Sequence, residues 1–334
     1  MVTISVVLPS YNGEKYIKDS IESVINQSFQ DWELILVDDC SIDSTLKIMS
    51  EYKNKDKRIK VIHNQKNQKL PLSLNAGFDM ASGKYHTWTS DDNVFREDAL
   101  LEMCKLLDNN PEYDVVYATS TNTDRRNGVS LVRTAPPVET ITNFYSVGAC
   151  FLYKKEVYLE TRGYNKDFYL CEDHEFFLNA YDKGFKFYAL DKNLYIYYLS
   201  DDSLSSNFRY EADNRIKDLL CYYLTERLQN LSPKEKSKRL IKFFFARKLP
   251  IEYKFLYSAV KVSPLYFIGR LPYILTKLLL PPILVKLIDI IFSSGKKIIK
   301  MLLPPILASI IKIICIKIKR YKKMSKKATL SKNQ

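Results

Sequence analysis

Pairs of acidic residues stand at three points where a predicted strand or loop ends. Asp38-Asp39 and Asp91-Asp92 each follow an apolar run, and Glu172-Asp173 open a predicted helix. One such pair could be structural, because Asp is common in turns and at helix N-caps. Adjacent carboxylates repel each other unless a cation lies nearby, and hard oxygen ligands favour Mg²⁺ or Mn²⁺. Such a metal usually completes its coordination with phosphates and water, so the three pairs together predict a nucleoside diphosphate ligand.

The sequence contains no glycine-rich loop that would hold that diphosphate. Neither a Walker A sequence nor a G-x-G-x-x-G turn is present, so backbone amides at a helix start are not expected to bind the phosphates. The metal would then supply the neutralising charge. The residues predict a metal-assisted enzyme that uses a nucleoside diphosphate, and they leave the reaction open.

Alternating strands and helices are expected to position these acids. Ile4 to Leu8 is a continuous apolar run, which is typical of a strand buried on both faces, and helical spacing of apolar residues begins after Glu14. Asp43 is a candidate N-cap for the second helix. Further strands are predicted at 33–37, 58–63, 84–89, 114–118, 147–153 and 194–199, and further helices at 44–52, 72–81, 96–107 and 172–183.

This alternation predicts an α/β fold with a mostly parallel sheet. In such sheets ligands bind beyond the carboxyl ends of the strands, which is where the acidic pairs are expected. The polar stretch from 119 to 143 has weak periodicity and is predicted to form flexible loops.

Five segments of the first 205 residues resemble family 2 glycosyltransferases, in their order and spacing. They read VVLPSYN from Val6, LVDDCS from Leu36, NAG from Asn75 with ASGKY from Ala81, SDDN from Ser90, and CED from Cys171. Each motif alone is modest, and the ordered set is specific. The resemblance implies a GT-A fold, with a Rossmann-like mostly parallel sheet flanked by helices, and inverting transfer of a sugar from a nucleoside diphosphate, most often UDP, to a hydroxyl.

The resemblance also implies a donor site. Pro9, Tyr11 and Asp39 would line the nucleoside pocket, with Asp39 accepting a hydrogen bond from the base. Lys69 stands near a basic position that some members use against the nucleotide, and Asp91 would meet the ribose or the sugar.

Metal and base are implied in the same way. Asp92 would be the ligand of Mn²⁺ or Mg²⁺, and Asp173 matches the catalytic base that takes the acceptor proton. The structural alternative for Asp173 is an N-cap of a helix over 175–183. His174 is interpreted as a surface or partly buried structural residue, because neighbouring residues on a helix point about 100° apart.

Two segments depart from the family pattern. Many relatives carry Tyr-Arg-x-His-x-x-Ser-Leu-Ser near the end of this domain, whereas residues 197–205 read YYLSDDSLS and lack both the Arg and the His. Thr89 replaces the first acid of the fuller Asp-x-Asp-Asp motif. A late loop that closes on the diphosphate through an Arg and a His is therefore not expected.

Charge and composition divide the 334 residues. Residues 233–334 hold 24 Lys and Arg against three acids, a net charge of +21, while the preceding part has a net charge of −8. We therefore predict a catalytic domain over 1–232 and a helical, basic region over 233–334. Six cysteines without a C-x-x-C pair indicate free thiols in a reducing compartment, and the N-terminus lacks the features of a signal peptide.

The basic region contains a repeat: residues 277–291 match 300–314, and each copy includes LLPPIL. Amphipathic, Lys-rich helices are drawn to anionic lipid, which predicts a peripheral protein on the cytoplasmic side of a bacterial cell membrane acting on a lipid-linked or cell-surface glycan. A helical subdomain packed on the catalytic domain is the alternative for this region. A catalytically idle GT-A scaffold is the first alternative function. A nucleic-acid-binding protein is the second, and nucleic acid is not expected as a partner because the front part is acidic.

Overall fold

The computed structural model describes residues 2–142, 147–201, 203–228, 231–246 and 253–279. The chain forms two compact units, Met1–Val262 and Ser263–Gln334, which are treated separately below. The repeat at 277–314 and the lysine-rich segment from 296 lie almost entirely outside the described residues, so the predictions made for them are unchanged.

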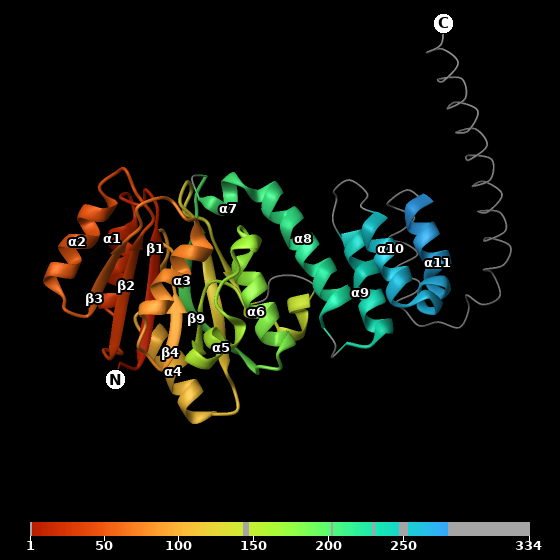
Figure 1. The fold of residues 1–334 in the computed structure, drawn as a ribbon, viewed down its shortest axis with the longest axis horizontal. Coiled ribbons are helices and arrows are strands. Elements are labelled where there is room, and N and C mark those ends of the chain that lie inside the picture. Colours follow the sequence, from red (N-terminus) through yellow and green to blue (C-terminus); the bar gives the residue numbers. More distant parts are fainter. Residues whose placement is uncertain (1, 143–146, 202, 229–230, 247–252, 280–334) are drawn as a thin grey trace, which may run out of the picture. The chain divides into compact units, whose positions relative to one another are not determined.

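A mixed sheet forms the centre of the first unit (Figure 1). Its order is β3-β2-β1-β4-β8-β6-β9-β5, and β7 pairs with β6. The first four of these strands in that order are parallel, as predicted. The strands are β1 (Ile4–Ser10), β2 (Trp32–Asp38), β3 (Ile59–His63), β4 (Tyr85–Trp88), β5 (Val94–Phe95), β6 (Val115–Asp124), β7 (Ser130–Arg133), β8 (Phe151–Lys154) and β9 (Phe187–Leu199).

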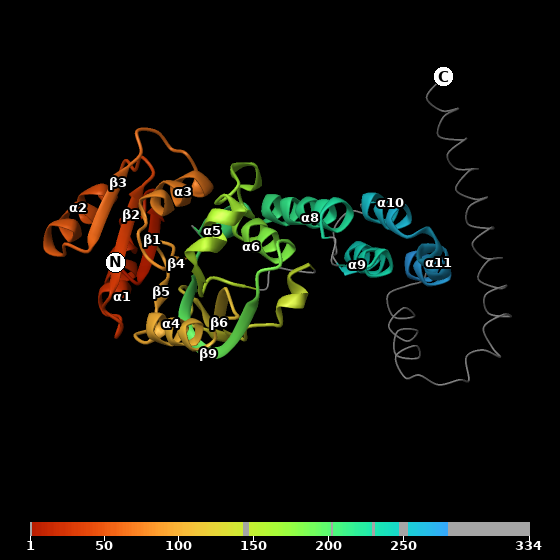
Figure 2. The ribbon, with the colours of Figure 1, turned by 60° about the horizontal axis from the view of Figure 1, so that its bottom comes forward.

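The polar stretch from 119 to 143 differs from its prediction as loops. β6 continues through it to Asp124, turns, and returns as β7, while β9 runs parallel to β6 along its whole length (Figure 2). A register shift on both sides of Thr119 marks the point where apolar residues give way to polar ones. The periodicity fails there because the strand leaves the core and faces a cavity, so polar side chains replace the apolar alternation.

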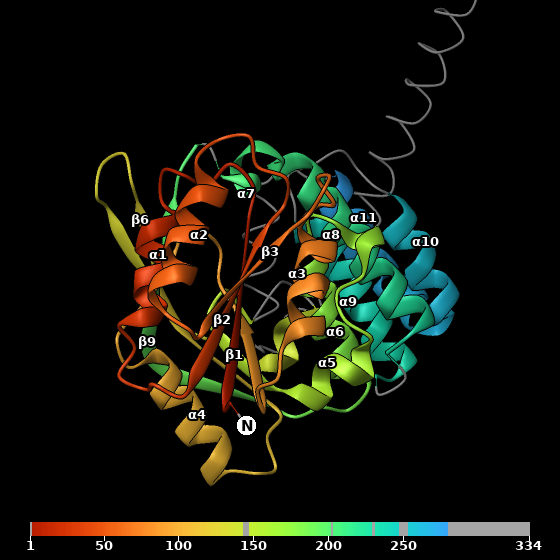
Figure 3. The same cartoon turned by 60° about the vertical axis from the view of Figure 1, so that its left-hand side comes forward.

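Helices cover both faces of the sheet (Figure 3). On one face, α1, α2 and α4 bury apolar residues against the even-numbered side chains of β1 and β2. On the other face lie α3, α5 and α6, where Gly77 of α3 packs against Val7 and Val37 and Phe177 of α6 packs against Phe151. The helices are α1 (Ile17–Ile25), α2 (Thr45–Lys55), α3 (Leu70–Met80), α4 (Ala99–Asn109), α5 (Lys155–Thr161) and α6 (Glu172–Asp182).

β1 shows why the sequence folds this way. All seven of its residues are buried, because helices pack on both faces and strands β2 and β4 pair on both edges. After β1 the chain turns through Asn12, whose φ is positive, and enters α1. The N-cap of α2 is Ser44 and not Asp43, although the Asp43 carboxylate still accepts a hydrogen bond from the Thr45 amide.

Three further helices complete the first unit: α8 (Arg209–Glu226), α9 (Pro233–Ala246) and α10 (Tyr253–Val262), with the short α7 (Leu204–Asn207) before them. The Tyr223 hydroxyl of α8 donates to the Glu175 carboxylate of α6 at 2.7 Å, and Ser237 of α9 donates to the Ala259 carbonyl of α10 at 3.0 Å. The compact unit therefore continues past the change of composition at 232/233 to Val262, and α8, α9 and α10 each contribute buried apolar residues.

The described part of the second unit is α11 (Pro264–Leu279). Among the described helices, none combines the length and the apolar composition that crossing a bilayer requires. The described cysteines are free thiols, as predicted: Cys40, Cys104, Cys150, Cys171 and Cys221.

Candidate active site

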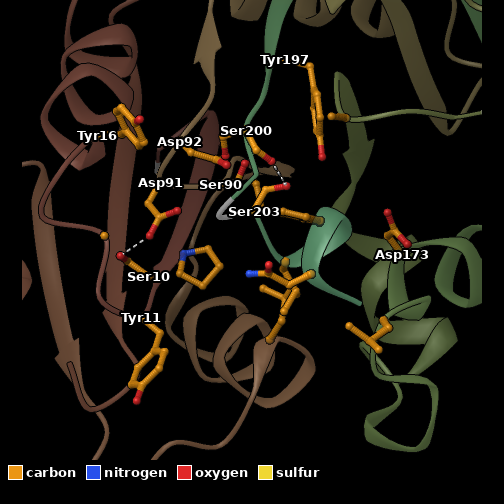
Figure 4. Close-up of a pocket in the computed structure, with 18 of the residues that line it drawn as sticks. Ser10, Tyr11, Tyr16, Ser90, Asp91, Asp92, Asp173, Tyr197, Ser200 and Ser203 are labelled. Atoms are coloured by element: carbon orange, nitrogen blue, oxygen red, sulfur yellow. Dashed lines mark hydrogen bonds between the residues drawn. The ribbon is translucent and has the colours of Figure 1, made fainter. Parts of the chain in front are cut away.

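A cavity of about 940 Å³ lies beyond the carboxyl ends of β1, β2 and β4. Its lining includes all seven residues singled out from the sequence: Pro9, Tyr11, Asp39, Lys69, Asp91, Asp92 and Asp173. In the close-up, Tyr11, Asp91 and Asp92 lie on one side and Asp173 on the other, with Ser200 and Ser203 between them (Figure 4). The fold thus brings together residues from three distant parts of the chain, although their individual roles remain predictions.

Asp39 organises the loop that carries Lys69. One carboxylate oxygen of Asp39 accepts hydrogen bonds from Asn64 Nδ2 at 2.9 Å and from the Gln68 amide at 2.8 Å, and the other accepts from the Lys69 amide at 2.9 Å. Lys69 is the N-cap of α3 and has a φ of 71°, a conformation that costs a side-chain-bearing residue about 1–3 kcal/mol. The buried Asp39 carboxylate therefore holds a strained backbone at the cavity wall, and it has room for one further donor.

Asp91 lies against the turn after β1. Its Oδ2 accepts a hydrogen bond from Ser10 Oγ, and burial, together with the charge of neighbouring Asp92, raises its pKa to about 7. The turn approaches so closely that a Cβ on Gly13 would lie 2.2 Å from Asp91 Oδ2 and 2.3 Å from Ser10 Oγ. Glycine is therefore required at position 13 for the carboxylate to occupy this place.

Asp92, the next residue, also lines the cavity. Burial raises the pKa of its carboxyl group, and hydrogen bonding and the nearby Arg125 charge oppose that rise only in part. Within the described residues, no cluster of three His, Cys, Asp or Glu side chains forms a metal cage. Two adjacent carboxylates with raised pKa values do fit a Mg²⁺ or Mn²⁺ ion that takes most of its ligands from a diphosphate and water.

Glu172 and Asp173 begin α6 at the far side of the cavity. The N-cap of this helix is Cys171, so Asp173 stands in the first turn and the alternative assignment of Asp173 as the N-cap does not hold. Glu172 is almost fully buried, and burial followed by the charge of Asp173 raises its pKa. The two acids are therefore unequal: the environment favours a protonated Glu172 beside Asp173.

Comparisons with known proteins decide the family. Residues 5–162 match the family model described as glycosyl transferase family 2. EpsE of Bacillus subtilis, which is named as a glycosyltransferase, is 31% identical over 235 residues, which cover 68% of this chain and 83% of EpsE. The chain belongs to glycosyltransferase family 2.

Solved structures show the same fold. The crystal structure of Staphylococcus aureus TarS 1–349 in complex with UDP superposes with a TM-score of 0.61 and 20% sequence identity. The match covers 82% of this chain and 86% of the TarS chain. The mannosyltransferase PcManGT from Pyrobaculum calidifontis, in complex with GDP-Man and Mn²⁺, superposes with a TM-score of 0.50 and 13% sequence identity. The match covers 93% of this chain and 85% of the PcManGT chain. The fold is GT-A, as expected from the motifs.

His174 has a structural place in this glycosyltransferase. It is buried, as only 1% of its surface is exposed, and its Nε2 lies 2.9 Å from the Ile141 carbonyl oxygen. Asp173 lines the cavity and His174 does not, as the 100° step between neighbouring helical residues predicts. The burial is deeper than the sequence suggested.

Sequence reasoning missed one wall of the cavity. Ser120 and Asn122 of β6 pair with Tyr195 and Tyr197 of β9, and Arg133 of β7 pairs with Ser120, so these five residues share one face of the sheet. All five line the cavity. Residues 119–124 read TSTNTD and are all polar, so the sequence shows no alternation there that would have indicated a strand.

Proposed function

We propose that this glycosyltransferase transfers a sugar, with inversion, from a UDP-sugar to a hydroxyl group of a lipid-linked or cell-surface glycan. The observation that carries the proposal is that one cavity is lined by both the Asp91-Asp92 pair and Asp173, although Asp92 and Asp173 are 81 residues apart in the chain. This reaction requires positive charge near the leaving diphosphate, which a bound cation would supply. It also requires a base that accepts the proton of the acceptor hydroxyl.

The donor would bind on the side formed by β1, β2 and α3. Pro9, Tyr11 and Asp39 would surround the nucleoside, with the remaining acceptor capacity of Asp39 directed to the base. Lys69 and Asp91 would meet the nucleotide and its ribose or sugar. That TarS was crystallised with UDP supports the choice of UDP, as a property of a protein with the same fold.

The acidic pair supports a divalent cation as cofactor. Asp92 would be the ligand of Mn²⁺ or Mg²⁺, and the ion would supply positive charge to the leaving diphosphate. PcManGT, which shares the fold, was crystallised with Mn²⁺. The raised pKa values of Asp91 and Asp92 support this assignment, because a cation would relieve the cost of holding both carboxylates ionised in a buried place.

Asp173 would be the catalytic base. The acceptor oxygen attacks C1 of the sugar, the bond from C1 to the diphosphate oxygen breaks, and the hydroxyl proton passes to the Asp173 carboxylate. The nucleoside diphosphate leaves with the bonding electrons. Glu172 is less suited to this role, because burial and the charge of Asp173 raise its pKa and so favour its protonated form.

A membrane-bound acceptor is favoured by the basic C-terminal region. Its net charge of +21 would attract an anionic membrane surface, which places the enzyme as a peripheral protein on the cytoplasmic side of the cell membrane, in the synthesis of a surface polysaccharide. Hexose and N-acetylhexosamine donors are both compatible with a cavity of this volume.

Calorimetry of UDP binding tests the metal and donor assignments together. We expect UDP to bind about tenfold more tightly with Mn²⁺ than in EDTA, and Asp92→Ala to remove the difference. Asp201→Ala is the matched control, because Asp201 is exposed, pairs with Arg126 and does not line the cavity. Equal affinity of the wild type in Mn²⁺ and in EDTA would contradict the proposal, and a screen of nucleotide sugars for hydrolysis would then identify the donor class independently.

A further inference from the structure

The guanidinium group of Arg125 is held between two tyrosine rings. Its central carbon lies 3.8 Å from the ring centroid of Tyr16 and 3.8 Å from that of Tyr198. Arg125 lies in the turn that follows β6, Tyr16 is the N-cap of α1, and Tyr198 lies near the end of β9, so one side chain joins three separate segments of the chain. A planar guanidinium suits such a stack, whereas an ammonium group does not.

Arg125 also makes a hydrogen bond to the backbone of the 90–93 loop, which contains Asp92. Its Nη2 donates to the Asp92 carbonyl oxygen at 2.8 Å, while its own amide donates to the Leu199 carbonyl at 3.0 Å. Its Nε is buried and makes no hydrogen bond within the described residues. A buried donor without a partner is unfavourable, and the Arg125 side chain has one while it contacts both tyrosines and Asp92.

A second connection runs from β9 to the same motif. The Tyr198 amide donates to Asn93 Oδ1 at 2.6 Å, and Asn93 Nδ2 donates to Asp92 Oδ1 at 2.7 Å. The backbone of Asp92 is therefore fixed by Arg125, and its carboxylate by Asn93, while Tyr198 contacts both of these residues. Tyr16 and Asp92 lie on the same side of the cavity (Figure 4).

We propose that Arg125 is a positioning residue that fixes the 90–93 loop so that the Asp92 carboxylate is held ready for a divalent cation. The metal part of this proposal rests on the proposed function. Tyr198 stands where the family's late segment has Arg, and the guanidinium group of Arg125, from the turn after β6, stacks on the Tyr198 ring.

Hydrogen exchange of the metal-free and nucleotide-free protein tests the positioning role. Arg125→Ala should raise the exchange of amides 90–93 by about tenfold or more, because the loop loses the charge-assisted hydrogen bond from Arg125 to the Asp92 carbonyl. Arg126→Ala is the matched control, since Arg126 is the next residue, is exposed, and pairs with Asp124 and Asp201 instead. It should leave exchange at 90–93 unchanged.

UDP binding tests the consequence for the metal. In Mn²⁺, Arg125→Ala should weaken UDP affinity by about tenfold, and in EDTA by less than about twofold. The reason is that only the metal-dependent contribution to UDP binding requires the 90–93 loop to be fixed. Arg125→Lys keeps the charge but loses the planar stack, so we expect it to resemble Arg125→Ala in both experiments. If Arg125→Ala proves unstable in thermal unfolding, Arg125→Lys serves in its place.

Three results would overturn the proposal: unchanged exchange at 90–93, equal losses of UDP affinity with and without Mn²⁺, or wild-type behaviour of Arg125→Lys. A wild type whose UDP affinity ignores Mn²⁺ is a different failure. It would refute the metal-dependent function and with it the metal-related purpose of Arg125, whereas the exchange experiment would still report whether Arg125 fixes the loop.

Discussion

At the scale of single residues, burial separates the two acids that begin α6. Glu172 is 4% exposed and lies beside the charge of Asp173, and both conditions raise its pKa. The raised pKa favours the protonated form of Glu172, whereas Asp173 is the carboxylate proposed to accept the acceptor proton. We therefore expect the same kind of substitution to have different effects at these two neighbouring positions.

Asp173→Asn should lower turnover by about a hundredfold or more, with donor affinity unchanged, because Asn keeps the shape but cannot take the acceptor proton. Glu172→Gln is the control, because a carboxyl group whose raised pKa favours the neutral form is replaced by a neutral amide, and we expect turnover within about fivefold of the wild type. Initial rates with donor and acceptor saturating measure both. Normal turnover of Asp173→Asn would exclude Asp173 as the base.

His86 is a buried residue outside the site with a separate consequence. It is fully buried, stacks on Phe78 at 5.2 Å between ring centroids, and has a pKa lowered to about 4 by burial. In the unfolded chain the imidazole protonates near its ordinary value of 6.5. The stability that depends on neutral His86 is therefore complete above pH 6.5 and is lost as the pH falls towards 4.

We predict that the free energy of unfolding falls by up to about 1.4 kcal/mol per pH unit across this window because of His86 alone. His86→Phe should reduce that dependence, since Phe fits among Phe78, Tyr153 and Tyr158 and has no proton to gain. Urea unfolding at pH 7 and at pH 5 provides the measurement. Identical pH dependence in the two proteins would show that His86 is not the group responsible.

At the scale of elements, the turn from β1 into α1 determines where Asp91 can lie. Gly13 is the contact point, because any side chain there meets Asp91 and Ser10 at less than 3 Å. The end of β1 and the turn that follows it therefore determine where the Asp91 carboxylate lies in the cavity.

Gly13→Ala should displace the Asp91 carboxylate and weaken UDP binding by about tenfold, with a loss of stability of about 1–3 kcal/mol from the steric conflict. Gly269→Ala is the contrasting variant: its added Cβ meets nothing within 4 Å in α11, and Ala in a helix is favoured over Gly by about 1 kcal/mol. Calorimetry and thermal unfolding check both. Full UDP affinity in Gly13→Ala would show that the turn can relax without moving Asp91.

At the scale of the whole molecule, the compact unit ends at Val262. Four leucines of α8 and the segment that follows it are fully buried: Leu219, Leu220, Leu224 and Leu228. Helices α9 and α10 contribute buried residues of their own, including Leu240 and Ala259. A cut at 232 would remove these partners, and each fully buried leucine that becomes exposed costs about 1.5–3 kcal/mol.

We therefore predict that residues 1–262 remain folded and bind UDP, whereas a chain ending at Ser232 aggregates. Residues 263–334 contain 15 Lys and Arg and one acid, so their removal should abolish flotation with anionic liposomes. The full chain should float, and about 1 M salt should weaken its binding by screening the charges. A full chain that ignores liposomes would contradict the membrane assignment.

The sequence by itself determined the first half of the sheet and the position of the acids. Strands β1 and β2 are short, rich in apolar residues and followed by turn residues, and β3 and β4 follow at the spacing of further strand–helix units, so these signals are local. Parallel strands present their carboxyl ends at one edge, so Asp39, Asp91 and Asp92 could be placed near each other before any coordinates were known.

Only the tertiary structure decided the second half and the ionisation of the site. β6 and β9 pair across about 70 residues of chain. The sequence predicts these strands only at 114–118 and 194–199, because the polar continuation of β6 carries no apolar period from which a strand could be inferred. The raised pKa of Glu172 and the stacking of Arg125 between Tyr16 and Tyr198 depend on burial and on contacts between distant segments. Desolvation and long-range packing act only after the chain has folded, which is why no local pattern predicts them.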